Sequence, residues 1–143
     1  MARELLLQVL FDHVGPSVNK MYFTLPHGRG KRVLTGEGVT FKNAMHMAVT
    51  EAWKEAGLPT IDEEEMLDLE LWFRFEKLRD AKGRFVKLDA SNRIKITEDA
   101  LMAALGIDDQ QNFHLDIWKT VGPPATLIRL WRLEEMPVWP IPT

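Results

Sequence analysis

Hydrophobic and polar positions follow two different periods in the first half of this chain. Residues 3–11 form a mainly apolar run, which predicts a buried strand. In residues 37–56 the apolar side chains recur at helical spacing, whereas residues 67–75 alternate strictly between apolar and polar side chains. The alternation predicts a half-buried strand. We therefore expect a strand, a long helix and a second strand, joined by loops.

The boundaries of the first helix can be predicted from its flanking residues. Thr35 suits the N-cap position, and Glu37 places a negative charge in the first turn. Gly57 and Pro59 follow the last apolar position and end the helix.

The second half of the chain supplies a shorter helix and two more strands. The helix is expected after residue 90 and ends at Gly106, and residues 113–117 and 126–133 read as strands. This order of elements predicts a small single-domain α+β fold, with two main helices packed on one mixed β-sheet.

The last residues of the chain differ from the rest in composition. We assign residues 1–135 to the folded domain and residues 136–143 to a C-terminal tail. Three prolines in the tail exclude both a helix and a central strand. Trp139 in this tail could dock against its own domain or against a dimer partner.

Composition excludes several classes of protein. The 143 residues contain no cysteine, so disulfides and thiolate metal sites are excluded and a cytoplasmic location is expected. No segment approaches the length that spans a membrane. The glycines and basic residues of segment 27–32 lack the phosphate-loop pattern, so no nucleotide cofactor is expected.

Charge is distributed unevenly along the chain. The net charge is −3, and residues 51–70 hold eight acidic residues and one basic residue. Residues 74–95 hold eight basic and three acidic residues, and residues 20–42 hold five basic and one acidic. Two basic regions on an acidic protein are consistent with binding to a polyanion. Ordinary solvated loops would give the same pattern, and charge alone does not separate the two interpretations.

The second helix carries a polar cluster opposite its apolar side. At about 100° per residue, Asn92, Lys95 and Asp99 lie within about 60° of one another. Asp89 stands just before this helix, and Asp109 follows its predicted end. Carboxylates brought together at such a place suit Mg²⁺, which prefers oxygen ligands. Helix caps, an i,i+4 ion pair and a turn would explain the same residues without a metal.

Three separate motifs of this chain resemble those of RusA-type Holliday junction resolvases. The main one is LDASNRIKITEDALMAALGIDD, residues 88–109, which is similar to the family signature of an acidic entrance, an asparagine, a lysine, an aspartate and a closing Asp-Asp pair. GPSVNKMY, residues 15–22, and TGEGVTFK, residues 35–42, resemble two further segments of the family in the same order.

The resemblance implies a function and its partners. Members of this family are homodimeric, Mg²⁺-dependent endonucleases that resolve four-way DNA junctions by paired symmetric nicks in DNA recombination and repair. Mg²⁺, with Mn²⁺ as the alternative, is therefore the expected cofactor, and four-way junction DNA and a second copy of the chain are the expected partners. A two-fold dimer suits a substrate with two symmetry-related strands to cut.

The resemblance also assigns roles to individual residues. Asp89 and Asp109 would be metal ligands, and Asp108 a weaker one. Asp99 would contact these ligands without binding the metal itself. Lys95 would be the catalytic lysine, with Asn92 and Ser91 beside it. The residues expected to contact DNA are Asn19, Tyr22, Arg29, Lys31, Arg32, Arg79, Lys82, Arg84 and Lys87.

Ser91 departs from the family pattern. It stands where the family commonly has a second aspartate, so one negative charge is missing from the expected metal site. The alternative function is a non-catalytic relative that binds junctions or other DNA and has lost its metal site through Ser91.

Overall fold

A computed structural model describes residues 2–16, 18–26, 30–86 and 91–142 of the chain, and the side chains of residues 18, 19, 91 and 92 lie outside this description. The elements are β1 (Arg3–Phe11), α1 (Val18–Met21), β2 (Tyr22–Thr24), β3 (Arg32–Leu34), α2 (Gly36–Glu55), β4 (Leu67–Phe75), α3 (Ser91–Leu105), the 3-10 turn η1 (Asp109–Gln111), β5 (Asn112–Val121) and β6 (Ala125–Leu133). The predicted α+β fold with a mixed sheet and two main helices is confirmed.

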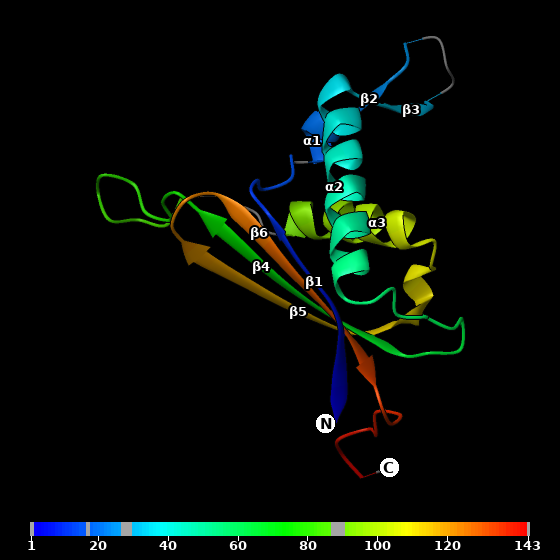
Figure 1. Cartoon of the computed structure of the whole chain (residues 1–143). Helices are drawn as coiled ribbons and strands as arrows, with labels where there is room; N and C mark the ends of the chain where they lie inside the picture. The colour runs from blue at the N-terminus through cyan, green and yellow to red at the C-terminus, as the bar shows by residue number, and fades with distance from the viewer. Residues whose placement is uncertain (1, 17, 27–29, 87–90, 143) are drawn as a thin grey trace.

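The main sheet has four strands in the order β1-β6-β4-β5. β4 pairs in parallel with β5 and antiparallel with β6, and β6 pairs antiparallel with β1. The parallel pair is joined by a crossover that contains α3. Helices α2 and α3 lie together on one side of this sheet (Figure 1).

The core lies between the sheet and these two helices. The odd positions of β4, from Leu67 to Phe75, are buried on the helix side together with Met45 of α2 and Leu101 of α3. Strand periodicity of two and helix periodicity of about 3.6 place these apolar side chains on facing surfaces, where burial of apolar area stabilises the fold.

Helix α2 begins as its sequence predicts. The Oγ1 atom of Thr35 accepts a hydrogen bond from the Gly38 amide at 3.0 Å, which confirms Thr35 as the N-cap. The Thr35 hydroxyl also donates to the Lys20 carbonyl oxygen at 2.6 Å, which ties α2 to α1. A Cβ atom at Gly38 would lie 2.5 Å from the Met21 carbonyl oxygen, so glycine permits this close approach.

Two features differ from the sequence prediction. Residues 13–31, between the first strand and the first long helix, were expected to form a loop, but they contain α1 and the strand β2, which pairs with β3 in a small hairpin. These elements have only three or four residues each, too few to show a period. β4 was expected to be half exposed, yet Asp68 and Glu70 are buried on the face away from the helices, at 4% and 6% exposure.

None of the described helices is long and apolar enough to cross a membrane. The part of the C-terminal tail that the structure describes, residues 136–142, forms no helix or strand.

Candidate functional site

One lysine on α3 joins three carboxylates. The Nζ atom of Lys95 lies 2.9 Å from Asp99 Oδ1 and 2.9 Å from Asp109 Oδ2. It also lies 3.7 Å from Glu98 Oε1. Asp99 and Glu98 are neighbours of Lys95 on the surface of the same helix, because residues three and four positions apart face the same way. Asp109 comes from beyond the end of the helix, so the cluster is a tertiary arrangement.

The end of α3 brings Asp109 back to the helix. Gly106 adopts a left-handed conformation with φ of 68°, and the Ile107 amide donates to the Met102 carbonyl oxygen at 3.1 Å. The chain then enters η1, whose N-cap is Asp108: its Oδ1 atom accepts from the Gln110 amide at 3.1 Å. This reversal turns the Asp109 side chain towards Lys95.

Glu98 is held in place from the start of β5. The Nδ2 atom of Asn112 donates to Glu98 Oε2 at 3.0 Å, and most of the Glu98 side chain is buried. Its other carboxylate oxygen, Oε1, is the one nearer to Lys95. The contact with β5 therefore orients one oxygen of Glu98 towards the cluster.

The cluster carries excess negative charge. Oxygen atoms of Glu98, Asp99 and Asp109 all lie within 4.8 Å of one another. Hydrogen bonds to Asp109 and Asp99 raise the pKa of Lys95 well above its usual range, and the Lys95 ammonium holds the pKa of Asp109 below its ordinary value. Three carboxylates and one ammonium leave two negative charges, the charge that one divalent cation would neutralise.

These residues could hold a metal ion of the hard type. Carboxylate oxygens are the ligands that Mg²⁺ and Mn²⁺ prefer, and Mg²⁺ commonly uses one or two carboxylates and completes its shell with water and substrate oxygens. A partly solvent-exposed carboxylate such as Asp109 is accessible for such an arrangement. The donor set therefore fits the cofactor that the sequence predicts.

An open depression adjoins the cluster. It has a volume of about 600 Å³, and Asp99, Asp108 and Asp109 line it together with the last turn of α3 and Gly106. Lys42 of α2 lines the same depression. The Lys42 ammonium therefore adds a second positively charged side chain to that of Lys95. It would attract an anionic group that approaches the carboxylates from solvent.

The predicted site residues fall into three groups. The structure brings together Lys95, Asp99 and Asp109, as the helical spacing and the resemblance imply. Asp108 caps η1 and is not one of the three clustered carboxylates. The remaining predictions for this site, Asp89, Ser91 and Asn92, cannot be placed: Asp89 lies outside the described residues, as do the side chains of Ser91 and Asn92.

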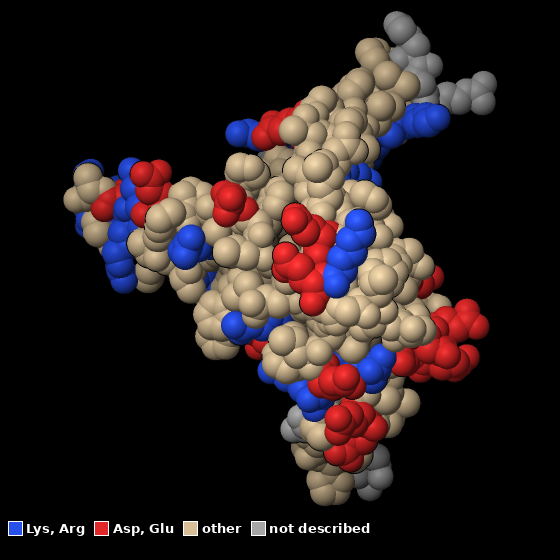
Figure 2. Space-filling view, viewed as in Figure 1, with Lys and Arg blue, Asp and Glu red and all other residues tan. Residues whose placement is uncertain are grey.

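The residues predicted to contact DNA whose side chains the structure describes lie on two hairpins. Lys31 and Arg32 belong to the β2–β3 hairpin, where the Arg32 guanidinium lies over the Tyr22 ring at 5.2 Å. Arg79, Lys82 and Arg84 belong to the hairpin that follows β4, which is closed by a bridge between Arg79 and Phe85. Figures 1 and 2 show that both hairpins project from the body of the protein and carry basic side chains near their ends. Arg29 and Lys87 lie outside the described residues, as does the Asn19 side chain.

Acidic side chains are grouped elsewhere. Figure 2 shows groups of them at the side of the protein formed by the loop before β4 and at the end where β6 leads into the tail, and others over α2 and beside the basic side chains of the hairpin after β4. The loop contains Asp62 and the three glutamates that follow it.

Sequence reasoning missed two residues of this site, Glu98 and Lys42. Glu98 stands three positions after Lys95, a spacing that places it on the same side of the helix. That spacing was the available signal. No pattern in the sequence identifies Lys42, because Lys42 and Asp99 line the same depression only as a result of how α2 packs against α3.

Comparison with known proteins does not assign the chain to a family. No protein-family model matches the sequence, and no curated protein matches it either.

Proposed function

We propose that this protein is a divalent-metal-dependent endonuclease that resolves four-way DNA junctions by paired nicks, as the resemblance to RusA-type resolvases implies. The observation that supports this proposal most directly is the contact of Lys95 with Asp99 and Asp109. These three residues match the lysine and two of the aspartates of the family signature. They also form an oxygen-rich, negatively charged cluster of the type that binds Mg²⁺.

In this proposal, one metal ligand precedes α3 in the sequence and the other follows that helix. Asp89 and Asp109 hold Mg²⁺ or Mn²⁺, and Glu98 and Asp99 keep the surrounding field negative. When bound, the ion neutralises charge on the scissile phosphodiester and lowers the pKa of a coordinated water. The Lys95 ammonium would stabilise negative charge that develops on the phosphate during attack.

The hairpins and the dimer have separate tasks in the same proposal. Arg79, Lys82 and Arg84 on one hairpin and Lys31 and Arg32 on the other neutralise phosphates of the junction arms. Such contacts provide affinity and orientation and carry little sequence information. A homodimer supplies two equivalent sites for two symmetry-related cuts.

A cleavage assay with a labelled four-way junction and a linear duplex of the same sequence tests this function. The wild-type protein is compared with an Asp89→Asn, Asp109→Asn double variant, in Mg²⁺ and in EDTA. A Glu51→Gln variant, altered on the exposed surface of α2, serves as the control. We expect symmetric nicks in the junction alone, with Mg²⁺, from the wild type and the control only.

The opposite result identifies the alternative function. Equal binding of the junction by all proteins, with no cleavage in Mg²⁺ or Mn²⁺, would assign the chain to the non-catalytic DNA-binding class. In that case a Ser91→Asp variant that gains cleavage would show that Ser91 removed the activity.

A further inference from the structure

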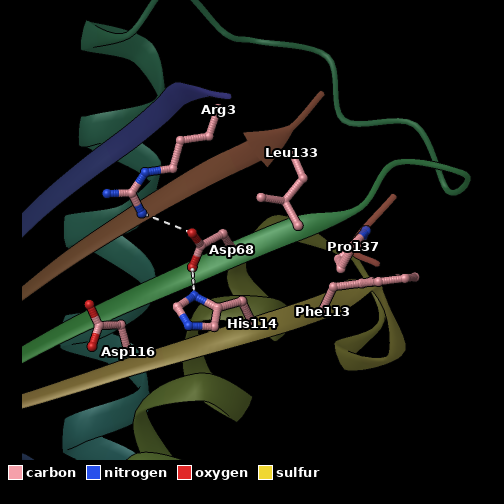
Figure 3. Close-up of a pocket in the computed structure, with 7 residues that line it drawn as sticks. All are labelled: Arg3, Asp68, Phe113, His114, Asp116, Leu133 and Pro137. Atoms are coloured by element: carbon pink, nitrogen blue, oxygen red, sulfur yellow. Dashed lines mark hydrogen bonds and ion pairs between the residues drawn. The ribbon is translucent and has the colours of Figure 1, made fainter. Parts of the chain in front are cut away.

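A pocket at one end of the main sheet has no task in the proposed function. It lies on the face of the sheet that points away from α2 and α3, and its walls come from β1, β4, β5, β6 and the start of the C-terminal tail (Figure 3). Its volume is about 460 Å³, which is within the range of sites for small organic molecules. No residue of the Lys95 cluster lines it, so it is a separate site.

The register of the sheet brings two polar side chains of β5 together in this pocket. His114 and Asp116 are two positions apart, so both lie on the same face of the strand. His114 is paired with Asp68 of β4, and Asp116 is paired with Glu70. β4 therefore places a buried carboxylate, that of Asp68, beside the imidazole of His114.

Asp68 fixes the orientation of the His114 ring. The Oδ1 atom of Asp68 lies 2.8 Å from His114 Nδ1, and its Oδ2 atom accepts from the Arg3 guanidinium at 2.8 Å. Figure 3 shows the Asp68 side chain between these two partners. Because an ionised carboxylate only accepts hydrogen bonds, Nδ1 of His114 is the donor, and in the neutral imidazole the Nε2 atom keeps its lone pair. The ring thus presents a hydrogen-bond acceptor in a fixed direction.

Two hydrogen-bond acceptors that line the pocket have no partner in the part of the chain that the structure describes. They are the Nε2 atom of His114 and the carboxylate of Asp116. Asp116 is half-buried, so water reaches its oxygen atoms less freely than those of an exposed side chain. A hydrogen-bond donor from a ligand would offset this incomplete solvation.

The charges around the pocket favour a cation. The Arg3 guanidinium lies 2.8 Å from Asp68 and 3.7 Å from Glu70, and Arg129 lies 3.0 Å from Glu70. These two arginines and two carboxylates balance one another, which leaves the negative charge of Asp116 without a counterpart among them. A bound cation would neutralise this charge, whereas a bound anion would be repelled by it.

The other side of the pocket is apolar. Phe113 is an extra residue of β5, at the point where the register with β4 shifts, and its side chain is 48% exposed. Leu133 at the end of β6 and Pro137 in the tail complete this wall (Figure 3). The face of an aromatic ring attracts a cation, and apolar neighbours favour a hydrocarbon group. The wall therefore suits an organic cation better than a hydrated metal ion.

We propose that this pocket binds a primary ammonium group carried on an apolar stem. An ammonium has three N–H donors on a compact charge, so it donates to Asp116 and to Nε2 of His114 at the same time. The stem contacts Phe113 and Leu133. A free alkylamine and the lysine side chain of a peptide share this chemistry. A quaternary ammonium has the charge but no N–H donor, so it leaves both acceptors unpaired.

An NMR titration of the isotope-labelled full chain, without metal or DNA, tests the proposal. The probes are n-butylamine, its neutral analogue n-butanol, and tetramethylammonium, which has the charge without the donors. With n-butylamine we expect saturable changes in the amide signals of residues 113–116, and an affinity at least about tenfold higher than for the other two probes.

N-acetyl-lysine amide, which carries the same stem on a peptide backbone, distinguishes the two sources of the ammonium group. Binding as tight as that of n-butylamine would show that the pocket accepts a lysine side chain. Binding of n-butylamine alone would show that it accepts free amines. Either result supports the proposal.

Three variants test the acceptors. Asp116→Asn keeps the shape of the side chain and removes its charge, so it should weaken n-butylamine binding at least about tenfold. His114→Asn retains a side-chain N–H for Asp68 but has no group in place of Nε2, so it should weaken binding at least about threefold. Glu51→Gln, on the exposed surface of α2, is the control and should bind as the wild type does. The dispersion of the amide signals identifies which variants are folded.

Three results would overturn the proposal. The first is a wild type in which n-butylamine changes no signal of residues 113–116, a result that does not depend on any variant. The second is equal affinity for n-butylamine and n-butanol, which would reduce the pocket to an apolar contact. The third is an unchanged affinity in a folded Asp116→Asn variant. Because the titration uses neither metal nor DNA, none of these results bears on the proposed endonuclease function.

Discussion

The Lys95 Nζ atom lies 2.9 Å from Asp109 Oδ2, although the two residues are fourteen positions apart. The contact exists because Gly106 ends α3 and η1 returns the chain to the helix surface. Lys95 also contacts Asp99, so its ammonium occupies the space where the carboxylates converge. A divalent ion that binds there competes with this ammonium for the same oxygen atoms.

Removal of the Lys95 charge should separate metal binding from catalysis. A Lys95→Met variant is expected to bind Mn²⁺ about tenfold more tightly, because the nearby positive charge no longer opposes the ion. Junction cleavage should fall at least about 100-fold, because the cation that stabilises the reacting phosphate is lost. Mn²⁺ titration by calorimetry and single-turnover cleavage measure the two effects.

Lys54→Met is the control for this experiment, since Lys54 lies in the last turn of α2 and makes none of the contacts described for Lys95. It should leave both quantities within about twofold of the wild type. Unchanged Mn²⁺ affinity in Lys95→Met would show that the ammonium and the ion do not share the carboxylates.

The two adjacent aspartates after α3 should behave differently. Asp108→Asn keeps an N-cap residue on η1, so the free energy of unfolding should change by less than about 0.5 kcal/mol. Asp109→Asn removes a carboxylate from the cluster and should weaken Mn²⁺ binding at least about tenfold. Calorimetry and urea unfolding of both variants check this. An equal loss of Mn²⁺ affinity in the two variants would instead make Asp108 a direct ligand.

The local elements of this fold could be predicted from the sequence. The α2 helix shows its period, its cap Thr35 and its terminator Gly57, and the alternation of β4 places the core side of that strand correctly. The pairing of strands could not be predicted, because the insertion of β6 between β1 and β4 depends on contacts between distant segments.

The candidate site was predicted only in part for the same reason. Lys95 and Asp99 are related by helical spacing within α3, whereas Asp109 reaches them through a chain reversal. The burial of Asp68 was missed because its partner Arg3 lies 65 positions away, beyond any local period.

Glu70 should make the protein sensitive to acid. Its pKa in the folded protein is lowered from an ordinary value of 4.5, so its stabilising contribution is present above that value and is lost as the pH falls through the lowered pKa. Glu70→Gln should cost about 2 kcal/mol at pH 7, because it removes the charge that Arg129 and the two indole groups hydrogen-bond, while the partly exposed Arg129 remains solvated. The variant should also lose less stability between pH 5 and pH 3 than the wild type, by the same linkage.

Urea unfolding followed by tryptophan fluorescence measures this effect, since Trp72 and Trp131 both donate to Glu70. Glu63→Gln, in the exposed loop before β4, provides the comparison and should resemble the wild type. Parallel pH profiles for the wild type and Glu70→Gln would contradict the assignment.

The hairpin after β4 should contribute to DNA affinity through charge alone. A Lys82→Ala, Arg84→Ala double variant should weaken binding to four-way and linear DNA by similar factors and reduce the slope of log affinity against log salt by about 2. Fluorescence anisotropy over a range of salt concentrations measures both quantities. Mn²⁺ affinity should not change, and an unaltered salt slope would show that this hairpin does not contact phosphates.

The position of β4 has a consequence for the backbone as well as for the side chains. Its residues pair with β5 from Leu67 to Phe75 and with β6 from Leu67 to Arg74, and side chains cover most of both faces. Among the strands that the structure describes, the edge strands β1 and β5 have a neighbour on one side only. The β4 amides that bond to neighbouring strands therefore exchange with solvent deuterium only when the whole domain opens, so their exchange rates report the global free energy of unfolding directly.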